Sequence, residues 1–329
     1  MIDLKNVFKE FSSKKIIIIG DVMIDTYISG KVNRISPEAP VPVVNFETKE
    51  HRLGGAANVA LNIKALGAKP YICTIVGNDD NGKLMEKLIN ENHLAKDGVI
   101  YSDERITTVK TRIIGNNQQL LRIDNEESGP VSKQLEFGIV ERIKEIVSKE
   151  QIDAIILQDY NKGVLTPKVI EGVIEFANSK NIPTAVDPKK DNFLAYKNVT
   201  LFKPNLKELK EGLDIDFEYQ PNEKEPFLNA IEQLKSIITP KYTFITLSEH
   251  GVYINNDSNH HFIPAHLRNI TDVSGAGDTV ISVAALCLAC DLKADLIAEV
   301  SNLAGGLVCE KVGVISIDKE QLMQEALSI

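Results

Sequence analysis

The sequence predicts an α/β protein with a doubly wound, mostly parallel sheet flanked by helices. Residues 14–20 (KKIIIIG) form a short aliphatic run, as expected for a strand that is buried on both faces. Similar runs recur and alternate with helical patterns, which is typical of βαβ units with right-handed crossovers. The 329 residues suffice for one large domain of this kind, which we expect to span 1–329. The expected strands are 14–20, 71–76, 154–157, 184–186 and 242–247, and the expected helices are 56–66, 82–90, 135–147, 167–179 and 226–238.

Two stretches interrupt this alternation and predict a second, smaller sheet. Residues 27–52 contain the run SPEAPVPVV, in which the prolines exclude a helix and favour an edge strand. Residues 106–124 alternate β-branched and polar side chains around a turn at Gly115-Asn116-Asn117. We expect these stretches to form a small β-sheet lid over the substrate, with two surface hairpins as the alternative.

Composition excludes several classes of protein. The chain carries 37 basic and 46 acidic residues, a formal net charge of −9, which argues against nucleic acid or an anionic membrane as a partner. The start of the chain lacks the apolar core of a signal peptide, and the longest apolar run, near 279–290, is too short to cross a bilayer. We therefore expect a cytoplasmic protein. Four scattered cysteines predict no disulfide framework, and the Cys287/Cys290 pair lies in an apolar helical pattern that favours packing.

The glycine-rich segment 270–279 (ITDVSGAGDT) carries the strongest functional signal. It leads into the apolar helical pattern 279–290, so Gly275, Ala276 and Gly277 are expected at a helix N-terminus, where free N–H groups attract an anion. Asp278 would then lie beside a bound phosphate, where its carboxylate could deprotonate an attacking hydroxyl. An ordinary helix start is the alternative. A dinucleotide fingerprint is disfavoured because Val280 occupies a position that needs glycine or alanine.

Three further motifs follow predicted strands, where ligands bind in open α/β sheets. Asp25 lies in the segment GDVMID (20–25), and a carboxylate there can accept hydrogen bonds from sugar hydroxyls. Gly54 and Gly55 permit close approach of a ligand, and Asn58 offers both a donor and an acceptor. In the third, 203–208 (KPNLKE), an amide and a carboxylate three residues apart suit a hydrated Mg²⁺ ion. Taken singly, each motif is more often a turn or a helix cap.

Together these motifs resemble the ribokinase-like (PfkB) family of carbohydrate kinases, over essentially the whole chain. The resemblance rests on the paired glycines 54–55 and on the segment 272–278. Within the family the chain is similar to the kinase domain of heptose-7-phosphate kinases of lipopolysaccharide precursor synthesis, most specifically through residues 34–43 (RISPEAPVPV). Further matches lie at 117–120, 159–160, 162–163 and 187–189. Many relatives carry a C-terminal adenylyltransferase domain, and we expect none here because the chain stops soon after Ser316.

The resemblance assigns roles to individual residues. Asp278 is the implied catalytic base, with Gly275, Ala276 and Gly277 as its anion hole. The implied sugar-contacting residues are Asp25, Gly54, Gly55 and Asn58. The implied nucleotide-binding residues are Asn205, Leu206, Lys207, Glu208, Ser248, Glu249, Gly251 and Asn302, of which Asn205 and Glu208 also hold the metal.

The resemblance also implies a reaction: ATP-dependent phosphorylation of the anomeric hydroxyl of D-glycero-D-manno-heptose 7-phosphate, with Mg²⁺ and, as a further candidate, a monovalent cation. Another ribokinase-like substrate, such as ribose, a fructose phosphate, a deoxygluconate or a nucleoside, is the alternative. The remote phosphate needs a cation; Lys162 is our choice over Lys189, Arg112 and Arg122, although most such side chains are only solvated surface charges. In this family the lid often supports dimers, so a homodimer is expected.

Overall fold

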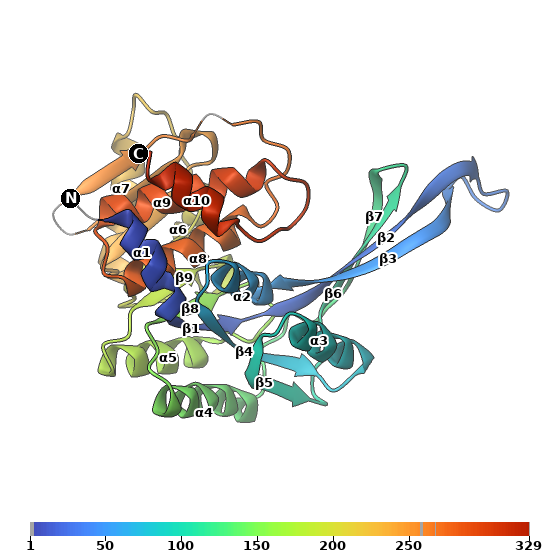
Figure 1. The fold of residues 1–329 in the computed structure, drawn as a ribbon, viewed down its shortest axis with the longest axis horizontal. Coiled ribbons are helices and arrows are strands. Elements are labelled where there is room, and N and C mark those ends of the chain that lie inside the picture. The colour runs from blue at the N-terminus through green and yellow to red at the C-terminus, as the bar shows by residue number, and fades with distance from the viewer. Residues whose placement is uncertain (1–2, 257–258, 267, 329) are drawn as a thin grey trace.

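A computed structural model describes residues 3–256, 259–266 and 268–328; the expected domain span of 1–329 therefore begins and ends outside the described residues. Within this part, the chain forms a nine-stranded sheet wrapped by helices and a separate four-stranded sheet. The smaller sheet extends away from the helical body as a long arm (Figure 1). The predicted α/β class and the predicted second sheet are both confirmed.

The large sheet has the strand order β13-β12-β11-β10-β9-β8-β1-β4-β5. Neighbouring strands are parallel from β11 through to β5, whereas β12 and β13 are antiparallel additions at one edge. The carboxyl ends of the parallel strands therefore meet at one edge of the sheet. The strands are β1 (Lys15–Gly20), β4 (Lys69–Gly77), β5 (Ala95–Ser102), β8 (Ala154–Gln158), β9 (Thr184–Asp187), β10 (Leu201–Phe202), β11 (Tyr242–Thr246), β12 (Val252–Asn255) and β13 (His260–Ile263).

Helices cover both faces of this sheet because its central strands are apolar on both sides. In β1, Ile16 and Ile18 pack into one core, while Ile17 and Ile19 pack into the other. Each fully buried isoleucine contributes roughly 1.5–3 kcal/mol relative to an exposed one. The first face is covered by α1 (Leu4–Glu10), α2 (Ala56–Ala65), α3 (Asp80–Glu91), α8 (Ala276–Ala289), α9 (Ala294–Cys309) and α10 (Lys319–Ala326). The second face is covered by α4 (Lys133–Lys149), α5 (Pro167–Ser179), α6 (Leu206–Leu213) and α7 (Glu225–Ile238).

The smaller sheet has the strand order β3-β2-β6-β7 and is formed by β2 (Val22–Ile35), β3 (Pro42–Gly55), β6 (Val109–Gly115) and β7 (Gln118–Asn125). The proline-containing strand β3 lies at its edge, as the sequence predicts. The turn between β6 and β7 places Asn116 and Asn117 at φ values of 51° and 64°, the left-handed conformation that two-residue hairpins require. The sheet is longer than expected, because β2 begins at Val22, with only Asp21 between it and the end of β1.

No helix in the described part of the chain is long and apolar enough to cross a membrane. The four cysteines are free thiols, and Cys287 is buried inside α8. This agrees with the packing role predicted for that pair.

Candidate active site

Polar side chains gather where the parallel strands end. Asp21 follows β1, Gln158 and Asp187 end β8 and β9, and Lys203 follows β10. All four are at most 5% exposed. A buried group of this polarity is costly unless its members pair with one another. Their contacts converge on the N-terminus of α8, where the glycine-rich segment lies.

Gly275, Ala276 and Gly277 form the start of α8. Gly275 is the N-cap, with a φ of 80° that suits glycine, and no side chain caps the helix. Ala276 N–H donates to the carbonyl of Val273 at 3.2 Å, but no side-chain acceptor covers the first turn, where the positive end of the helix dipole lies. A methyl group added at Gly277 would lie 3.7 Å from Asp187 Oδ2 and 3.9 Å from Lys203 Nζ, so the turn lies directly beside this charged pair. The geometry supports anion binding at this turn.

The Asp278 carboxylate is buried in the first turn of α8 and accepts three hydrogen bonds. The donors are Asn58 Nδ2 to Oδ2 at 2.7 Å, the Tyr160 hydroxyl to Oδ1 at 2.7 Å, and Gln158 Nε2 to Oδ1 at 3.2 Å. Burial raises the pKa of Asp278 to about 6, because it outweighs the hydrogen bonds that favour the ionised form. A carboxylate with a pKa near neutrality is suited to general-base work.

Asp187 and Lys203 form a buried ion pair beside this turn, with Lys203 Nζ 3.0 Å from Asp187 Oδ1. Burial opposes ionisation of Asp187, but the ammonium groups of Lys203 and Lys189 hold its pKa below the usual value. Gln158 Nε2 also donates to Asp187 Oδ2, at 3.1 Å, and so links the pair to Asp278. Within this pair, Lys203 places an ammonium group beside the turn where a phosphate would bind.

On the other side of Asp278, the predicted sugar-contacting residues lie together. Asn58 is in the first turn of α2, directly after Gly54 and Gly55, and reaches Asp278. A methyl group at Gly54 would lie 2.2 Å from Asp25 Oδ2, so only glycine leaves room for that carboxylate. Asp25 is 5% exposed and paired with Arg112. The four residues Asp25, Gly54, Gly55 and Asn58 therefore form one continuous wall.

Lys162 lies in a loop beside this wall, with its ammonium group bound to Glu126. The distance from Lys162 Nζ to Glu126 Oε1 is 2.8 Å, and Lys110 Nζ lies 3.3 Å from Glu126 Oε2. Two of the other candidate cations are in the site as well: Arg112 pairs with Asp25 in the wall, and Lys189 is close enough to act on Asp187 and Asp278. Arg122 pairs with Asp124 on the four-stranded sheet, while Lys189 pairs with Glu208.

The predicted nucleotide and metal motif forms the N-terminus of α6. Asn205 and Glu208 make a reciprocal capping box: Glu208 N–H donates to Asn205 Oδ1 at 2.8 Å, and Asn205 N–H donates to Glu208 Oε2 at 2.9 Å. Glu208 Oε1 accepts from Lys189. Each carboxylate oxygen of Glu208 thus has one partner and retains a lone pair for a metal-bound water. No cluster of three or more metal-ligating side chains of the His, Cys, Asp and Glu types occurs in the described residues.

Of the other nucleotide-site candidates, Ser248, Glu249 and Gly251 lie in the turn after β11, and Asn302 lies on α9. Thr246, at the end of β11, forms a bridge with Asn205, and Ser248 and Glu249 follow it in an exposed turn. Gly251 closes that turn at a φ of 85°. On α9, Asn302 Nδ2 donates to the carbonyl of Pro264 at 2.8 Å.

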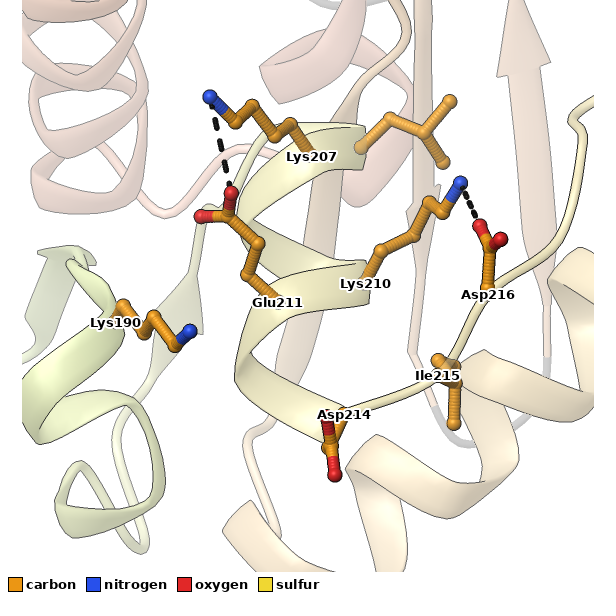
Figure 2. Close-up of a pocket in the computed structure, with 8 residues that line it drawn as sticks. Lys190, Lys207, Lys210, Glu211, Asp214, Ile215 and Asp216 are labelled. Atoms are coloured by element: carbon orange, nitrogen blue, oxygen red, sulfur yellow. Dashed lines mark ion pairs between the residues drawn. The ribbon is translucent and has the colours of Figure 1, made fainter.

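Leu206 and Lys207 line a hollow of about 590 Å³ on the outer side of α6 (Figure 2). Figure 2 shows ion pairs from Lys207 to Glu211 and from Lys210 to Asp216 at this hollow. None of the residues that line it belongs to the Asp278 cluster. The hollow therefore adjoins the predicted nucleotide motif at Leu206 and Lys207 but lies outside the Asp278 cluster.

The structure thus brings Asp278, its glycine turn and Asn58 into direct contact. It also places next to Asp278 residues that the sequence analysis had not assigned there. Tyr160 and Gln158 contact Asp278, while Asp187 and Lys203 flank the turn. Each of these residues follows or ends a strand, and this position in the sequence was the signal that could have identified them as site residues. The contacts of Tyr160 and Gln158 with Asp278, however, cross 118 and 120 residues of sequence.

A buried carboxylate at an anion-attracting helix start, with the ammonium group of Lys203 beside it, is an arrangement suited to phosphoryl transfer. A family model described as pfkB family carbohydrate kinase matches residues 13–321, so the chain belongs to this family. The protein is therefore a phosphotransferase that acts on a sugar hydroxyl. This confirms the resemblance and the enzyme class inferred from the sequence.

Curated relatives are similar over most of this chain. The bifunctional protein HldE of Campylobacter jejuni is 39% identical over 310 residues, which cover 94% of this chain and 64% of the relative. That of Citrifermentans bemidjiense is 35% identical over 326 residues, which cover 98% of this chain and 65% of the relative. The chain thus spans about two-thirds of the length of these relatives.

Solved structures show the same fold. Escherichia coli phosphofructokinase-2 in complex with potassium aligns with a TM-score of 0.77 at 17% identity, covering 96% of this chain and 98% of that one. Arabidopsis thaliana ribokinase complexed with ribose and ATP aligns with a TM-score of 0.72 at 16% identity, covering 96% and 99%. The ribokinase-like architecture predicted from the sequence is confirmed.

Proposed function

We propose that this protein transfers the γ-phosphoryl group of ATP to the anomeric hydroxyl of D-glycero-D-manno-heptose 7-phosphate, giving the 1,7-bisphosphate for ADP-heptose and lipopolysaccharide core synthesis. The observation that carries the kinase chemistry is the buried Asp278 carboxylate at the glycine turn. The choice of sugar is supported by the segment 34–43 and by the similarity to proteins named HldE.

In the proposed mechanism, Asp278 takes the proton of the sugar hydroxyl as its oxygen attacks the phosphoryl group in line. The N–H groups of residues 275–277 stabilise charge on the transferring oxygens, and Lys203 adds positive charge beside them. Asp25, Gly54, Gly55 and Asn58 orient the sugar, which lowers the entropic cost of reaction.

The nucleotide and its metal are assigned to the adjacent strand ends. Asn205–Glu208, with Ser248, Glu249, Gly251 and Asn302, would hold ATP. Asn205 and Glu208 would hold a hydrated Mg²⁺ through its waters, because the free lone pairs of Glu208 fit such an ion. Bound there, Mg²⁺ neutralises phosphate charge. A monovalent cation remains a candidate activator.

We assign the remote phosphate of the sugar to Lys162, whose ammonium group is already held in place by Glu126. A phosphate that binds there competes with the Glu126 carboxylate. A charge-assisted hydrogen bond contributes roughly 1.5–3 kcal/mol, enough to favour the phosphorylated sugar by one to two orders of magnitude.

An ADP-release assay with ATP and a panel of sugars tests this assignment. We expect heptose 7-phosphate to exceed free heptose, ribose and fructose 6-phosphate by orders of magnitude in kcat/KM. Lys162→Met should remove much of the preference for the phosphorylated heptose while the slow reaction of free heptose persists. Lys168→Met, at an exposed position of α5, is the matched control and should change neither rate. A higher kcat/KM with ribose or fructose 6-phosphate would contradict the heptose assignment.

We further propose that the four-stranded sheet acts as a lid over the sugar and pairs with a second copy of the chain. Its base adjoins the sugar-contacting residues, because β2 begins after Asp21 and β3 ends at Gly55. Several of its apolar side chains are exposed, including Phe46 at 65% and Ile123 at 53%. A homodimer through this sheet would cover them.

A further inference from the structure

The two oxygens of the Asp278 carboxylate have unequal partners. Oδ1 accepts from the Tyr160 hydroxyl at 2.7 Å and from Gln158 Nε2 at 3.2 Å, whereas Oδ2 accepts only from Asn58 Nδ2, at 2.7 Å. Each carboxylate oxygen offers about two lone-pair sites. Among the described residues, therefore, Oδ1 is filled and Oδ2 keeps one site open.

The Tyr160 hydroxyl is held in place by the loop that carries it. Asp21 Oδ2 accepts from the N–H groups of Tyr160 and Lys162, and Asp21 Oδ1 accepts from that of Val164, each at 3.0 Å. Gly163 has a φ of 91°, and a methyl group there would lie 1.9 Å from the carbonyl oxygen of Gly129. The loop is thus anchored to the end of β1 and tightly packed. This fixes the position from which the Tyr160 side chain reaches Asp278.

The Tyr160 hydroxyl can only donate to its partner at working pH. Burial, followed by the negative charge of Asp278, raises the pKa of Tyr160 well above its ordinary value, so the phenol keeps its proton. Gln158 is fixed by a similar logic: its Nε2 donates to both Asp278 Oδ1 and Asp187 Oδ2, and a flipped amide would turn its oxygen toward two carboxylates.

We propose that Tyr160 is a positioning residue that, with Gln158, occupies Oδ1 of Asp278 and so directs the proton of the sugar hydroxyl to Oδ2. This inference rests on the proposed kinase mechanism and deepens it. It identifies Oδ2 as the carboxylate oxygen that takes the proton. It also gives the Tyr160 hydroxyl, in the matched segment 159–160, the role of holding Oδ1.

Tyr160→Phe tests the inference because it removes only the hydroxyl and keeps the ring. We expect kcat to fall about 10- to 100-fold, with the KM for sugar and ATP changed less than about threefold. The acid limb of the kcat profile should move up by roughly one pH unit, since loss of a donor to a carboxylate favours its protonated form. The charged groups that face Asp278, namely Asp187, Lys203 and Lys189, are unaltered in this variant.

Tyr196→Phe is the matched control. Tyr196 is also a buried tyrosine whose hydroxyl donates to a carboxylate, Asp159 Oδ2, at 2.6 Å, but it does not contact Asp278. This variant should lose stability and leave the acid limb in place. A Tyr160→Phe enzyme with an unmoved limb and a raised sugar KM would overturn the inference, because Tyr160 would then be a sugar contact alone.

A readout without turnover separates this inference from the proposed function. The ¹³Cγ resonance of Asp278 can be assigned by comparing native protein with Asp278→Asn after labelling of aspartate. We expect its titration midpoint to rise in Tyr160→Phe and to stay unchanged in Tyr196→Phe. An unchanged midpoint in Tyr160→Phe would overturn the inference even if kinase activity is found. Absence of kinase activity with every sugar, together with a raised midpoint, would instead overturn the proposed function and leave the contact established.

Discussion

At the scale of single residues, Asp278 shows two opposing influences on one carboxylate. The helix N-terminus and three hydrogen-bond donors favour the ionised form, while burial at 6% exposure disfavours it. Burial prevails, and the pKa rises to about 6. A carboxylate with this pKa is ionised at neutral pH yet can accept a proton, as the proposed role of a base requires.

Asp278→Asn should lower turnover by roughly 10²–10⁴-fold, the range for loss of a general base, because the amide keeps the shape but cannot accept the hydroxyl proton. ATP should still bind, as isothermal titration calorimetry would show. Turnover close to that of the native enzyme would end the assignment of Asp278 as the base.

Asp278→Asn should also change stability in a pH-dependent way. The folded-state pKa of Asp278 is raised from 3.8 to about 6, so the folded protein binds more protons than the unfolded chain between these values. Stability is then lost as pH rises through this window, by about 3 kcal/mol at most. The Tm of the variant minus the Tm of the native protein should therefore increase as pH rises from 4 to 7. A Tm difference that is constant over this range would contradict the raised pKa.

At the scale of elements, the sequence predicted those strands and turns whose structure is determined by a local residue pattern. The isoleucine run of β1, the proline edge of β3 and the asparagine turn after β6 each carry their own signal. Strand β10, with only two residues, has too little sequence for a pattern and depends on its neighbours β9 and β11. Helix α8 begins at Ala276, three residues before the apolar pattern starts, because its first turn is polar and lies in the site.

The contacts around Asp278 could not be predicted in the same way. Asn58, Gln158 and Tyr160 are separated from it by 220, 120 and 118 residues. A strand-end position indicates that a side chain lies near the site, but only the packed fold decides which oxygen it reaches.

The N-terminus of α6 gives a prediction about the metal. Glu208→Gln should raise the Mg²⁺ concentration that half-maximal activity requires, because the amide is a weaker acceptor for metal-bound water. Glu211→Gln, one turn further along α6 and paired with Lys207, is the control and should leave the Mg²⁺ titration unchanged. An unchanged titration in both variants would place the metal elsewhere, for example near Asp187.

At the scale of the whole molecule, the four-stranded sheet projects from the helical body and exposes apolar side chains (Figure 1). If a second copy covers this sheet, Phe46→Glu should convert a dimer into a monomer in light scattering coupled to gel filtration. Phe137→Glu removes a side chain that is 69% exposed on α4, a helix that packs against the large sheet, and should leave the mass unchanged. A native protein that is monomeric at micromolar concentration would contradict the proposed pairing.

The attachment of that sheet to the body has a mechanical consequence. Strand β2 starts beside Asp21, which anchors the Tyr160 loop, and β3 runs into α2, which carries Asn58. A strand of 14 residues is about 45 Å long, so a tilt of ~10° at its base displaces its tip by roughly 8 Å. The base of the sheet is thus joined to the two segments that carry Tyr160 and Asn58, both donors to Asp278. A partner bound at the far end of the sheet would therefore act, over this length, on the position of the proposed base.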